Sequence, residues 1–343
     1  VVADDEEKIL KAEEDLEGLT FESFFTFDNF VVGSANRFAH AASLAVADNN
    51  NIIYNPLVIY GPSGVGKTHL LLAIKNYIKN KYPYKNIEYI RGEDFTNQLI
   101  KSLHEGKLGM GTIDDFRNKF RNVDVLLIDD IHFIAGKEST QEEFFNIFND
   151  LYQLNKQIII ASDRSVDDLK TLENRLLTRF NWGLTANITP PDFDLRMSII
   201  ERKIAYQESA KDVPKEVIEY IANNFASDVR QLEGAITRLI AYSTIMGGES
   251  INLDLAMEAL KEEYVNLLKS DSLLFSVYKA VDGIRTQHDI AIHISTTEMS
   301  VSRKLTVLAE HGLIEIKTVV GKKKIYQHTV AEKAFGLMKV EIE

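Results

Sequence analysis

The residues that point most directly to chemistry form a glycine-rich loop early in the chain: Gly61, Pro62, Ser63, Gly64, Val65, Gly66, Lys67 and Thr68. Their spacing fits G-x-x-x-x-G-K-[ST], in which glycines let backbone N–H groups turn inward around phosphate oxygens. In this pattern the lysine reaches the β- and γ-phosphates, and the hydroxyl of the last residue can bind Mg²⁺. We therefore expect these residues and the adjacent His69 to bind a nucleoside triphosphate.

A second motif, VDVLLIDDI, follows at 123–131. An apolar strand that ends in an acid places Asp129 at the edge of a sheet, where Mg²⁺ would sit beside the phosphates. Asp130, the next residue, would lie beside the attacking water. Two acids after an apolar run can also cap a helix, so this motif is specific only in combination with the loop. Together the two motifs predict a site for ATP or ADP with Mg²⁺.

The elements that must position these residues alternate between strands and helices from Phe27 to Ile188. Apolar, strand-like runs lie at 56–60, 86–90, 123–129, 157–162 and 182–188. Runs with apolar residues at helical spacing lie between them, at 67–81, 93–105 and 140–155. This alternation indicates an α/β fold, in which helices cover both faces of a parallel sheet.

The pattern changes after Pro190 and Pro191, where strand-like runs give way to helical ones at 192–209, 214–225, 229–243 and 253–268. From about Ser270, three short helices precede two β-rich pieces, IEIKTVV and KKKIYQH, which is the order of elements in a winged helix. We expect an acidic segment, an α/β nucleotide-binding domain, a helical domain and a winged-helix (α+β) domain, at 1–25, 26–190, 191–265 and 266–343.

Composition and charge exclude several classes of protein. The 343 residues contain no cysteine, which rules out disulfides, thiolate metal sites and cysteine nucleophiles. No apolar stretch approaches the ~18 residues of a membrane span. The acidic start is not that of a signal peptide, so we expect a cytoplasmic protein. The net charge is −12, but residues 1–25 hold nine acids and two lysines, while 266–343 hold eleven bases and nine acids. The overall charge therefore does not exclude nucleic acid as a partner.

From about Thr26 to Tyr264 the chain resembles the AAA+ core of the DnaA family, the bacterial chromosomal replication initiators. The resemblance rests on blocks that occur in the family's order: NPLVIYGPSGVGKTHLL, FRNKFRNVDVLLIDDIHFIAGKESTQEEFFNIFNDL, QIIIASDR, LENRLLTRFNWGL and SDVRQLEGAITRLIAYS. It implies a P-loop AAA+ parallel sheet followed by a helical lid at 191–265.

The resemblance also implies roles for residues outside the two motifs. Asp163 stands at the sensor I position and would detect the γ-phosphate through the attacking water, with a helix N-cap as its alternative role. Arg179 corresponds to the arginine finger that reaches the ATP of a neighbouring subunit. Arg175 is a second candidate, or forms only a surface ion pair. Arg230 corresponds to sensor II, which the lid carries onto the γ-phosphate of its own subunit.

Val31, Val32 and Asn36 lie in a segment that resembles the stretch around the adenine, although an ordinary amphipathic helix explains its alanines equally well. Between the two motifs, a helical stretch at 95–121 resembles the initiator-specific insertion. In that family the insertion steers assembly into an open helical filament and helps to line a path for single-stranded DNA.

Two positions match residues that are associated with single-stranded DNA in the family, Ile100 and Lys137. His132, where glutamine is usual, and Ser139, where a basic residue is common, depart from the family pattern. These departures weaken the prediction for single-stranded DNA, and an exposed loop lysine is the alternative for Lys137.

The C-terminal region does not resemble the family's helix-turn-helix domain, so its residues are assigned from the winged-helix pattern alone. Residues of the third helix expected to face the core are Ile294, Val301, Leu305 and Leu308. Residues expected to contact duplex DNA are Ser300, Ser302, Arg303 and Thr306 on the third helix, and Lys322, Lys323 and Lys324 at a loop tip. The alternative is a winged helix that binds protein.

The function that we expect is ATP-dependent initiation of chromosomal replication, through origin recognition and duplex opening. ATP would favour a head-to-tail oligomer through Arg179, and hydrolysis would act as a slow off-switch. Two alternatives are a transcription regulator whose ATPase controls oligomerisation on promoters, and a helicase-loader-like protein. Neither the recognised DNA sequence nor the rate of hydrolysis follows from the sequence.

Overall fold

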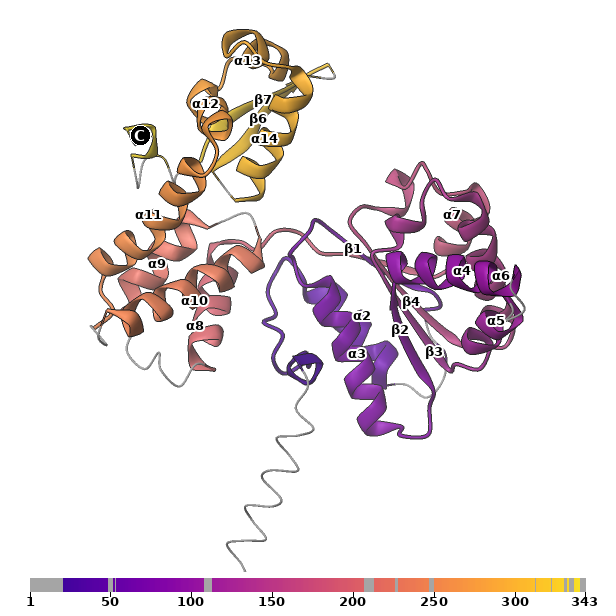
Figure 1. The fold of residues 1–343 in the computed structure, drawn as a ribbon. Coiled ribbons are helices and arrows are strands. Elements are labelled where there is room, and N and C mark those ends of the chain that lie inside the picture. Colours follow the sequence, from indigo (N-terminus) through magenta and orange to yellow (C-terminus); the bar gives the residue numbers. More distant parts are fainter. Residues whose placement is uncertain are drawn as a thin grey trace, which may run out of the picture. The chain divides into compact units, whose positions relative to one another are not determined.

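The computed structural model describes residues 21–48, 52, 54–107, 113–206, 213–225, 228–246, 250–311, 313–321, 323–329, 332 and 336–339. The expected acidic segment at 1–25 lies almost entirely outside these ranges. The chain divides after Pro190 into two compact units, residues 1–190 and 191–343 (Figure 1).

The first unit is built on a five-stranded parallel sheet with the strand order β2-β3-β4-β1-β5. The strands are β1 (Leu57–Tyr60), β2 (Ile87–Arg91), β3 (Val125–Asp129), β4 (Gln157–Ser162) and β5 (Leu184–Asn187). Both β3 and β4 are buried at every residue, because helices cover both faces of these mainly apolar strands. The prediction of a parallel α/β sheet is confirmed.

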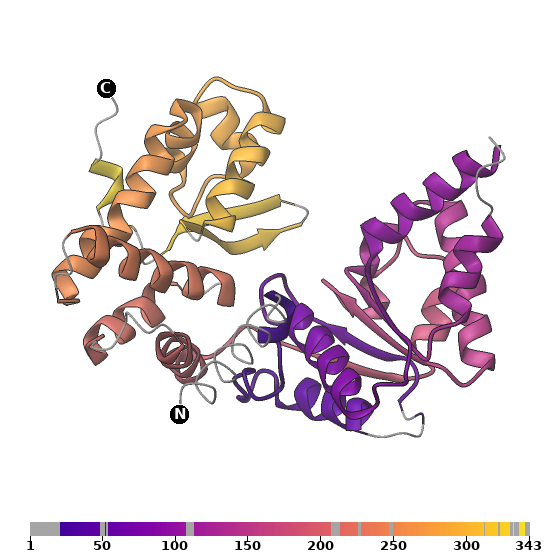
Figure 2. The ribbon, with the colours of Figure 1, turned by 60° about the horizontal axis from the view of Figure 1, so that its bottom comes forward.

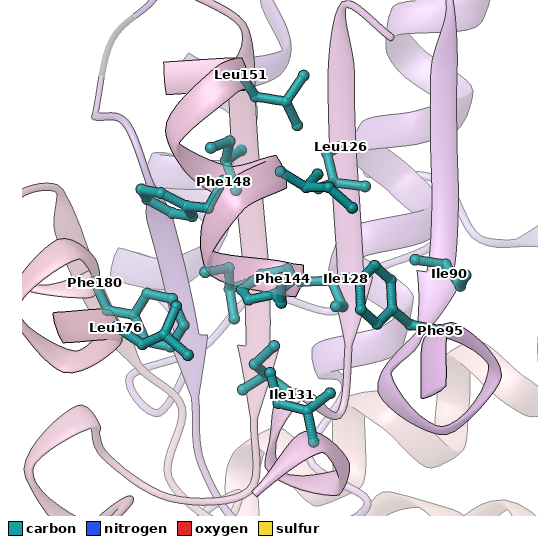
Figure 3. Packing of buried hydrophobic residues seen from close by; sticks show 14 of the residues in the cluster. Ile90, Phe95, Leu126, Ile128, Ile131, Phe144, Phe148, Leu151, Leu176 and Phe180 are labelled. Carbon is teal, nitrogen blue, oxygen red and sulfur yellow. The ribbon is translucent and has the colours of Figure 1, made fainter. Parts of the chain in front are cut away.

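Helices cover the two faces of this sheet, as Figures 1 and 2 show from two directions. One face carries α2 (Arg37–Asp48) and α3 (Lys67–Lys81). The opposite face carries α4 (Gly92–Lys107), α5 (Ile113–Arg121), α6 (Glu138–Gln153) and α7 (Asn174–Phe180). Successive strand side chains alternate between the faces, so Leu57 and Ile59 join one core and Val58 the other. The second core combines branched aliphatic residues with phenylalanines, among them Phe95, Phe144, Phe148 and Phe180 (Figure 3).

The topology brings the expected site residues to one edge of the sheet. Because the strands are parallel, the loops that follow β3, β4 and β1 leave the same edge, and these three strands are neighbours. The glycine-rich loop follows β1, Asp129 ends β3, and Asp163 follows β4. Short 3₁₀ helices continue two of these connections: η2 (Ile131–Ile134) after β3 and η3 (Val166–Asp168) after β4.

The second unit begins with α8 (Phe193–Ala205), α9 (Lys215–Asn224), α10 (Val229–Ile245) and α11 (Leu253–Lys269). Polar side chains start three of these helices, since Asp192, Asp228 and Asn252 each accept a hydrogen bond from the backbone N–H three residues later. Helix α11 ends at Lys269, beyond the boundary expected after residue 265.

The rest of the second unit contains α12 (Ser272–Ala280), α13 (Gln287–His293) and α14 (Glu298–Glu310), then β6 (Ile314–Val320), β7 (Lys323–His328) and the 3₁₀ helix η4 (Leu337–Lys339). Strands β6 and β7 form a small antiparallel sheet. Val301, Leu305 and Leu308 on α14 are buried, as expected. The placement of Ile294 in the third helix is wrong: α14 begins only at Glu298, and Ile294 is the half-buried C-cap residue that follows α13. Across the described residues, no helix combines the length and the apolar composition that a membrane crossing requires.

Candidate functional site

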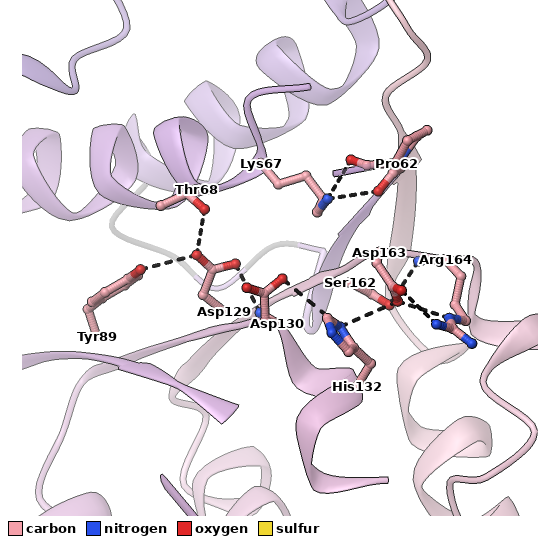
Figure 4. A network of polar contacts seen from close by, with 11 residues as sticks. Pro62, Lys67, Thr68, Tyr89, Asp129, Asp130, His132, Ser162, Asp163 and Arg164 are labelled. Atoms are coloured by element: carbon pink, nitrogen blue, oxygen red, sulfur yellow. Dashed lines mark hydrogen bonds and ion pairs between the residues drawn. The ribbon is translucent and has the colours of Figure 1, made fainter. Parts of the chain in front are cut away.

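The side chain of Lys67 lies inside the glycine-rich loop that connects β1 to α3. Its Nζ donates to the carbonyl oxygens of Gly61 and Pro62, both at 2.7 Å, and only 6% of the residue is exposed (Figure 4). Gly66 precedes the helix with φ +103, and a Cβ there would lie 2.9 Å from the ring of Phe30. Glycine is therefore required at this position, both for the backbone angle and for the space.

The start of α3 adds a second feature that suits an anion. Gly66 offers no side chain to cap the helix, so the backbone N–H groups of its first turn have no side-chain acceptor from that position. These groups and the helix dipole place partial positive charge beside the buried ammonium of Lys67. The positive charge of Lys67 and of the helix terminus complements the negative charge of a phosphate chain.

The carboxylate of Asp129 lies at the end of β3 and accepts several hydrogen bonds, and the residue is only 2% exposed. One carboxylate oxygen accepts from the hydroxyl of Thr68 at 2.7 Å and from the hydroxyl of Tyr89 at 3.1 Å, while the other accepts from the backbone N–H of Asp130 at 2.9 Å. Burial raises the pKa of the Tyr89 hydroxyl, and the negative charge of Asp129 raises it further. Tyr89 is therefore a permanent hydrogen-bond donor to this carboxylate.

The pair formed by Thr68 and Asp129 fits Mg²⁺. A hydroxyl and a carboxylate oxygen 2.7 Å apart are the ligand types that this ion prefers. Within the described residues, no group of three or more His, Cys, Asp or Glu side chains could hold a metal ion. In the usual Mg²⁺ site beside phosphates, one or two protein oxygens are supplemented by waters and phosphate oxygens.

A second network joins the loops after β3 and β4 (Figure 4). Asp130 has φ 51, a left-handed conformation, and its carboxylate lies 4.0 Å from Nδ1 of His132. The same nitrogen lies 3.3 Å from the carboxylate of Asp163, although the geometry is not that of a hydrogen bond. Sequence reasoning treated His132 only as a departure from a family pattern, yet it bridges the two acids.

Asp163 is also fixed by its neighbour Arg164, whose guanidinium donates to both carboxylate oxygens at 2.9 and 2.7 Å. Partial burial acts to raise the pKa of Asp163, but the hydrogen bonds from Arg164 and the nearby charges of His132, Arg164 and Lys67 lower it overall. Asp163 is therefore ionised at neutral pH. It is not a helix N-cap, because Ser165 precedes η3, so that alternative is wrong.

The segment before α2 is held by Asn36, which is 5% exposed. Its side-chain amide donates to the carbonyl of Val31 at 2.9 Å, and its amide oxygen accepts from the N–H of Gly33 at 2.8 Å. Val31 is half-buried and Val32 is exposed. Asn36 thus shapes the 31–33 loop, while Val32 presents an apolar surface that suits a flat base.

His69 anchors the preceding segment to α3. Its Nε2 lies 2.8 Å from the carbonyl of Thr26, and its ring packs edge-on against Phe25 and Phe30, with centroids 5.1 Å away in each case. Burial lowers the pKa of His69, so the ring is neutral and donates to Thr26. The expected contact of His69 with the ligand is thus limited to its backbone. Its anchoring role was not found from the sequence.

Comparison with known proteins agrees with this geometry. Residues 21–187 match the family model described as the bacterial DnaA ATPase domain. The crystal structure of domain III from the Thermotoga maritima replication initiation protein DnaA is 42% identical, with a TM-score of 0.65. The match covers 70% of this chain and 96% of that one. This chain belongs to the DnaA family.

Other DnaA structures are similar over more of the chain. DnaA from Aquifex aeolicus, bound to AMPPCP, is 33% identical with a TM-score of 0.60, over 84% of this chain and 92% of that one. A DnaA bound to AMPPCP and single-stranded DNA is 30% identical with a TM-score of 0.58, over 83% of this chain and 92% of that one. RuvB of Thermotoga maritima, a Holliday junction branch migration motor, is only 17% identical at a TM-score of 0.59, a likeness of fold alone.

The arginines that the DnaA resemblance singles out lie on different elements. Arg175 and Arg179 are on α7, and Arg230 is exposed in the first turn of α10 in the second unit. Arg175 forms an ion pair with Glu173 at 2.5 Å, as its alternative role requires. Arg179 has no acidic side chain within ion-pair distance among the described residues, and its guanidinium carbon lies 3.8 Å from the ring centre of Trp182.

The residues expected to contact nucleic acid are placed as follows. Ile100 on α4 and Lys137, just before α6, are both exposed. On α14, Arg303 and Thr306 are exposed and Ser302 is half-buried, whereas Ser300 is half-buried and bonded to Thr297 at the helix start. Lys323 and Lys324 are exposed on β7, and Lys322 lies outside the described residues.

Some of these residues share a groove in the second unit. Its volume is about 290 Å³. The groove is lined by Thr286, Gln287, His288, Glu298, Ser302, Thr306, Lys323, Lys324 and Tyr326. It therefore brings the outer side of α14 together with the basic start of β7.

Proposed function

We propose that this DnaA family member is an ATP-controlled initiator of chromosomal replication that acts in the cytoplasm. The observation that carries the proposal is the pairing of Thr68 with Asp129 beside the buried, loop-held ammonium of Lys67. This arrangement supports binding of a nucleoside triphosphate, since it offers positive charge and donors to the phosphates. AMPPCP, an ATP analogue, is bound in two of the similar DnaA structures.

In the nucleotide-bound state, Lys67 would neutralise the β- and γ-phosphates, and the backbone N–H groups of residues 63–66 would donate hydrogen bonds to them. Thr68 and Asp129 would hold Mg²⁺, which supplies charge neutralisation at the phosphate oxygens when it is bound. Asp130 would orient the attacking water and accept its proton, and Asp163 would detect the γ-phosphate through that water. Val31, Val32 and Asn36 would form the surface for the adenine.

Assembly would couple this site to a second copy of the chain. Arg179 would reach the γ-phosphate of the ATP held by a neighbouring subunit, and Arg230 would reach the γ-phosphate of its own subunit. A contact that joins one surface to a different surface of the next copy forms a ring where its rotation closes and an open helix where it does not. We assign the open helical form to this chain. Hydrolysis to ADP would remove the γ-phosphate and act as a slow off-switch.

DNA binding would use both units. We assign residues 191–265 to a helical lid and residues 266–343 to a winged helix that binds duplex DNA. Arg303, Thr306 and Ser302 would enter a groove of the duplex, while Lys323 and Lys324 would contact phosphates. The shared groove of α14 and β7 supports this assignment. Ile100 and Lys137 would contact single-stranded DNA, a ligand that is bound in one of the similar DnaA structures.

Two experiments test this function: chromatin immunoprecipitation from cells, and footprinting with the purified protein. The proposal expects protected, repeated sites clustered in one chromosomal region, with protection that extends in ATP and retreats in ADP. Sites scattered over promoters would favour the transcription regulator instead. Absence of any protected duplex, with ATP binding intact, would favour the helicase-loader-like protein.

A further inference from the structure

Two arginines on α7 are held in different ways. The guanidinium of Arg175 is neutralised by Glu173 at 2.5 Å and lies 4.4 Å from the ring centre of Phe145. The guanidinium of Arg179 has no acidic partner among the described residues and lies 3.8 Å from the ring centre of Trp182, close enough for face-to-face contact. Arg179 is therefore a cation held by a ring and not by an opposite charge.

The backbone around Trp182 is fixed on both sides. Before it, Phe180 is fully buried in the core, and the N–H of Trp182 donates to the carbonyl of Arg179 at 3.2 Å. After it, Gly183 packs so closely on Pro56, the residue before β1, that a Cβ would lie 1.8 Å from the carbonyl oxygen of Pro56. Only glycine fits at position 183. The close packing of Gly183 fixes the turn that places Trp182 beside Arg179.

The ring of Trp182 is also supported from the core outwards. Phe148 of α6 is fully buried, as Figure 3 shows, and it stacks on Tyr152 with ring centres 6.1 Å apart. Tyr152 in turn contacts Trp182 with ring centres 5.5 Å apart. Trp182 itself is 50% exposed. A large, half-exposed indole that connects the core to a cation is a rigid platform, because its orientation is set by contacts on several sides.

We propose that Trp182 is a positioning residue for Arg179. Stacking covers the face of the guanidinium, but its N–H donors lie in the plane of the group and stay directed outwards, where a phosphate can accept two of them. A free arginine side chain would lose rotamer freedom when it engages a neighbouring subunit, and the stack removes part of this loss beforehand. The inference rests on the proposed role of Arg179 towards the nucleotide of a second copy.

The fluorescence of Trp182 reports on its stack with Arg179 in the unassembled protein, because Trp182 is the single tryptophan of the 343-residue chain. In the nucleotide-free full-length protein, Arg179→Ala should shift the emission maximum or lifetime of Trp182, whereas Arg175→Ala should leave both unchanged. Identical emission from the parent and Arg179→Ala would overturn the proposed stack.

Its consequence is measured by ATP-dependent assembly of full-length variants in sedimentation velocity. Trp182→Ala should raise the protein concentration for half-assembly about three- to tenfold, whereas Trp182→Phe should keep it close to the parental value. In an Arg179→Ala background, adding Trp182→Ala should change nothing further, since Trp182 acts through Arg179. Equal effects of Trp182→Ala in both backgrounds would show a merely structural role and overturn the inference alone. A parent protein that does not assemble with ATP would overturn the proposed role of Arg179, and the inference with it.

Discussion

Lys67 is a buried ammonium whose hydrogen bonds run to carbonyls of the loop that carries it. Lys67→Ala removes the positive charge that would face the β- and γ-phosphates, so ATP affinity should fall about 10- to 100-fold. Isothermal titration calorimetry measures the affinity of each variant for ATP. Lys79→Ala, which removes an exposed lysine from the last turn of the same helix, is the matched control and should bind like the parent. Unchanged affinity of Lys67→Ala would remove the loop from nucleotide binding.

Asp129 and Asp130 are adjacent but are held differently. Asp129 is buried and accepts three hydrogen bonds, whereas Asp130 projects from a left-handed backbone towards His132. Asp130→Asn should therefore slow single-turnover ATP hydrolysis about a hundredfold or more, while ATP affinity falls much less. Asp167→Asn, in the exposed start of η3, serves as the control. If Asp130→Asn hydrolyses ATP at the parental rate, Asp130 is not the general base.

At the scale of elements, the segment at 25–30 is attached to α2 through His40 and to α3 through His69. Both histidines are neutral and lie among aromatic rings. Phe27 packs edge-on against His40 with ring centres 5.4 Å apart, and Phe30 contacts both His40 and His69. Burial lowers the pKa of His40 and of His69. The unfolded chain therefore binds more protons than the folded one as the pH falls below about 6.5, and stability is lost in that direction.

This attachment predicts a pH-dependent unfolding temperature. Between about pH 7.5 and pH 5.5, the parent should lose more thermal stability than His69→Gln, which keeps a donor for the carbonyl of Thr26 but does not titrate. Differential scanning calorimetry at both pH values gives the comparison. Equal losses in the two proteins would show that His69 is protonated without cost in the folded state.

The elements that the sequence predicts best are those with the simplest local pattern. The strands β3 and β4 follow from their apolar runs, and the loop before α3 follows from its glycine and lysine spacing. The ring contacts of His69, the bridge at His132 and the stack on Trp182 could not be predicted. His69 on α3 contacts Phe25 and Phe30, His132 and Asp163 follow different strands, and Trp182 is held beside Arg179 by Tyr152 of α6. These contacts depend on tertiary packing and leave no periodic signal in the chain.

At the scale of the whole molecule, the two units carry different chemistry, and duplex DNA should engage the second. Neutralising Lys322, Lys323 and Lys324 removes phosphate contacts, so affinity should fall for every sequence and the salt slope should shrink by about one per lost contact. Arg303→Ala should instead weaken binding only at a preferred base, by about 1–3 kcal/mol. Mobility shifts at several salt concentrations separate the two effects. Parental binding by the triple lysine variant would place the DNA surface elsewhere.

The central claim is that ATP, bound in the first unit, joins copies of this chain through Arg179. Sedimentation velocity of the full-length protein, with ATP and then with ADP at the same concentration, tests it most directly. We expect large oligomers with ATP and predominantly monomers with ADP. At the protein concentration where the parent assembles, Arg179→Ala should stay monomeric with both nucleotides. Monomers of the parent with saturating ATP, or the same oligomers with ADP, would contradict it.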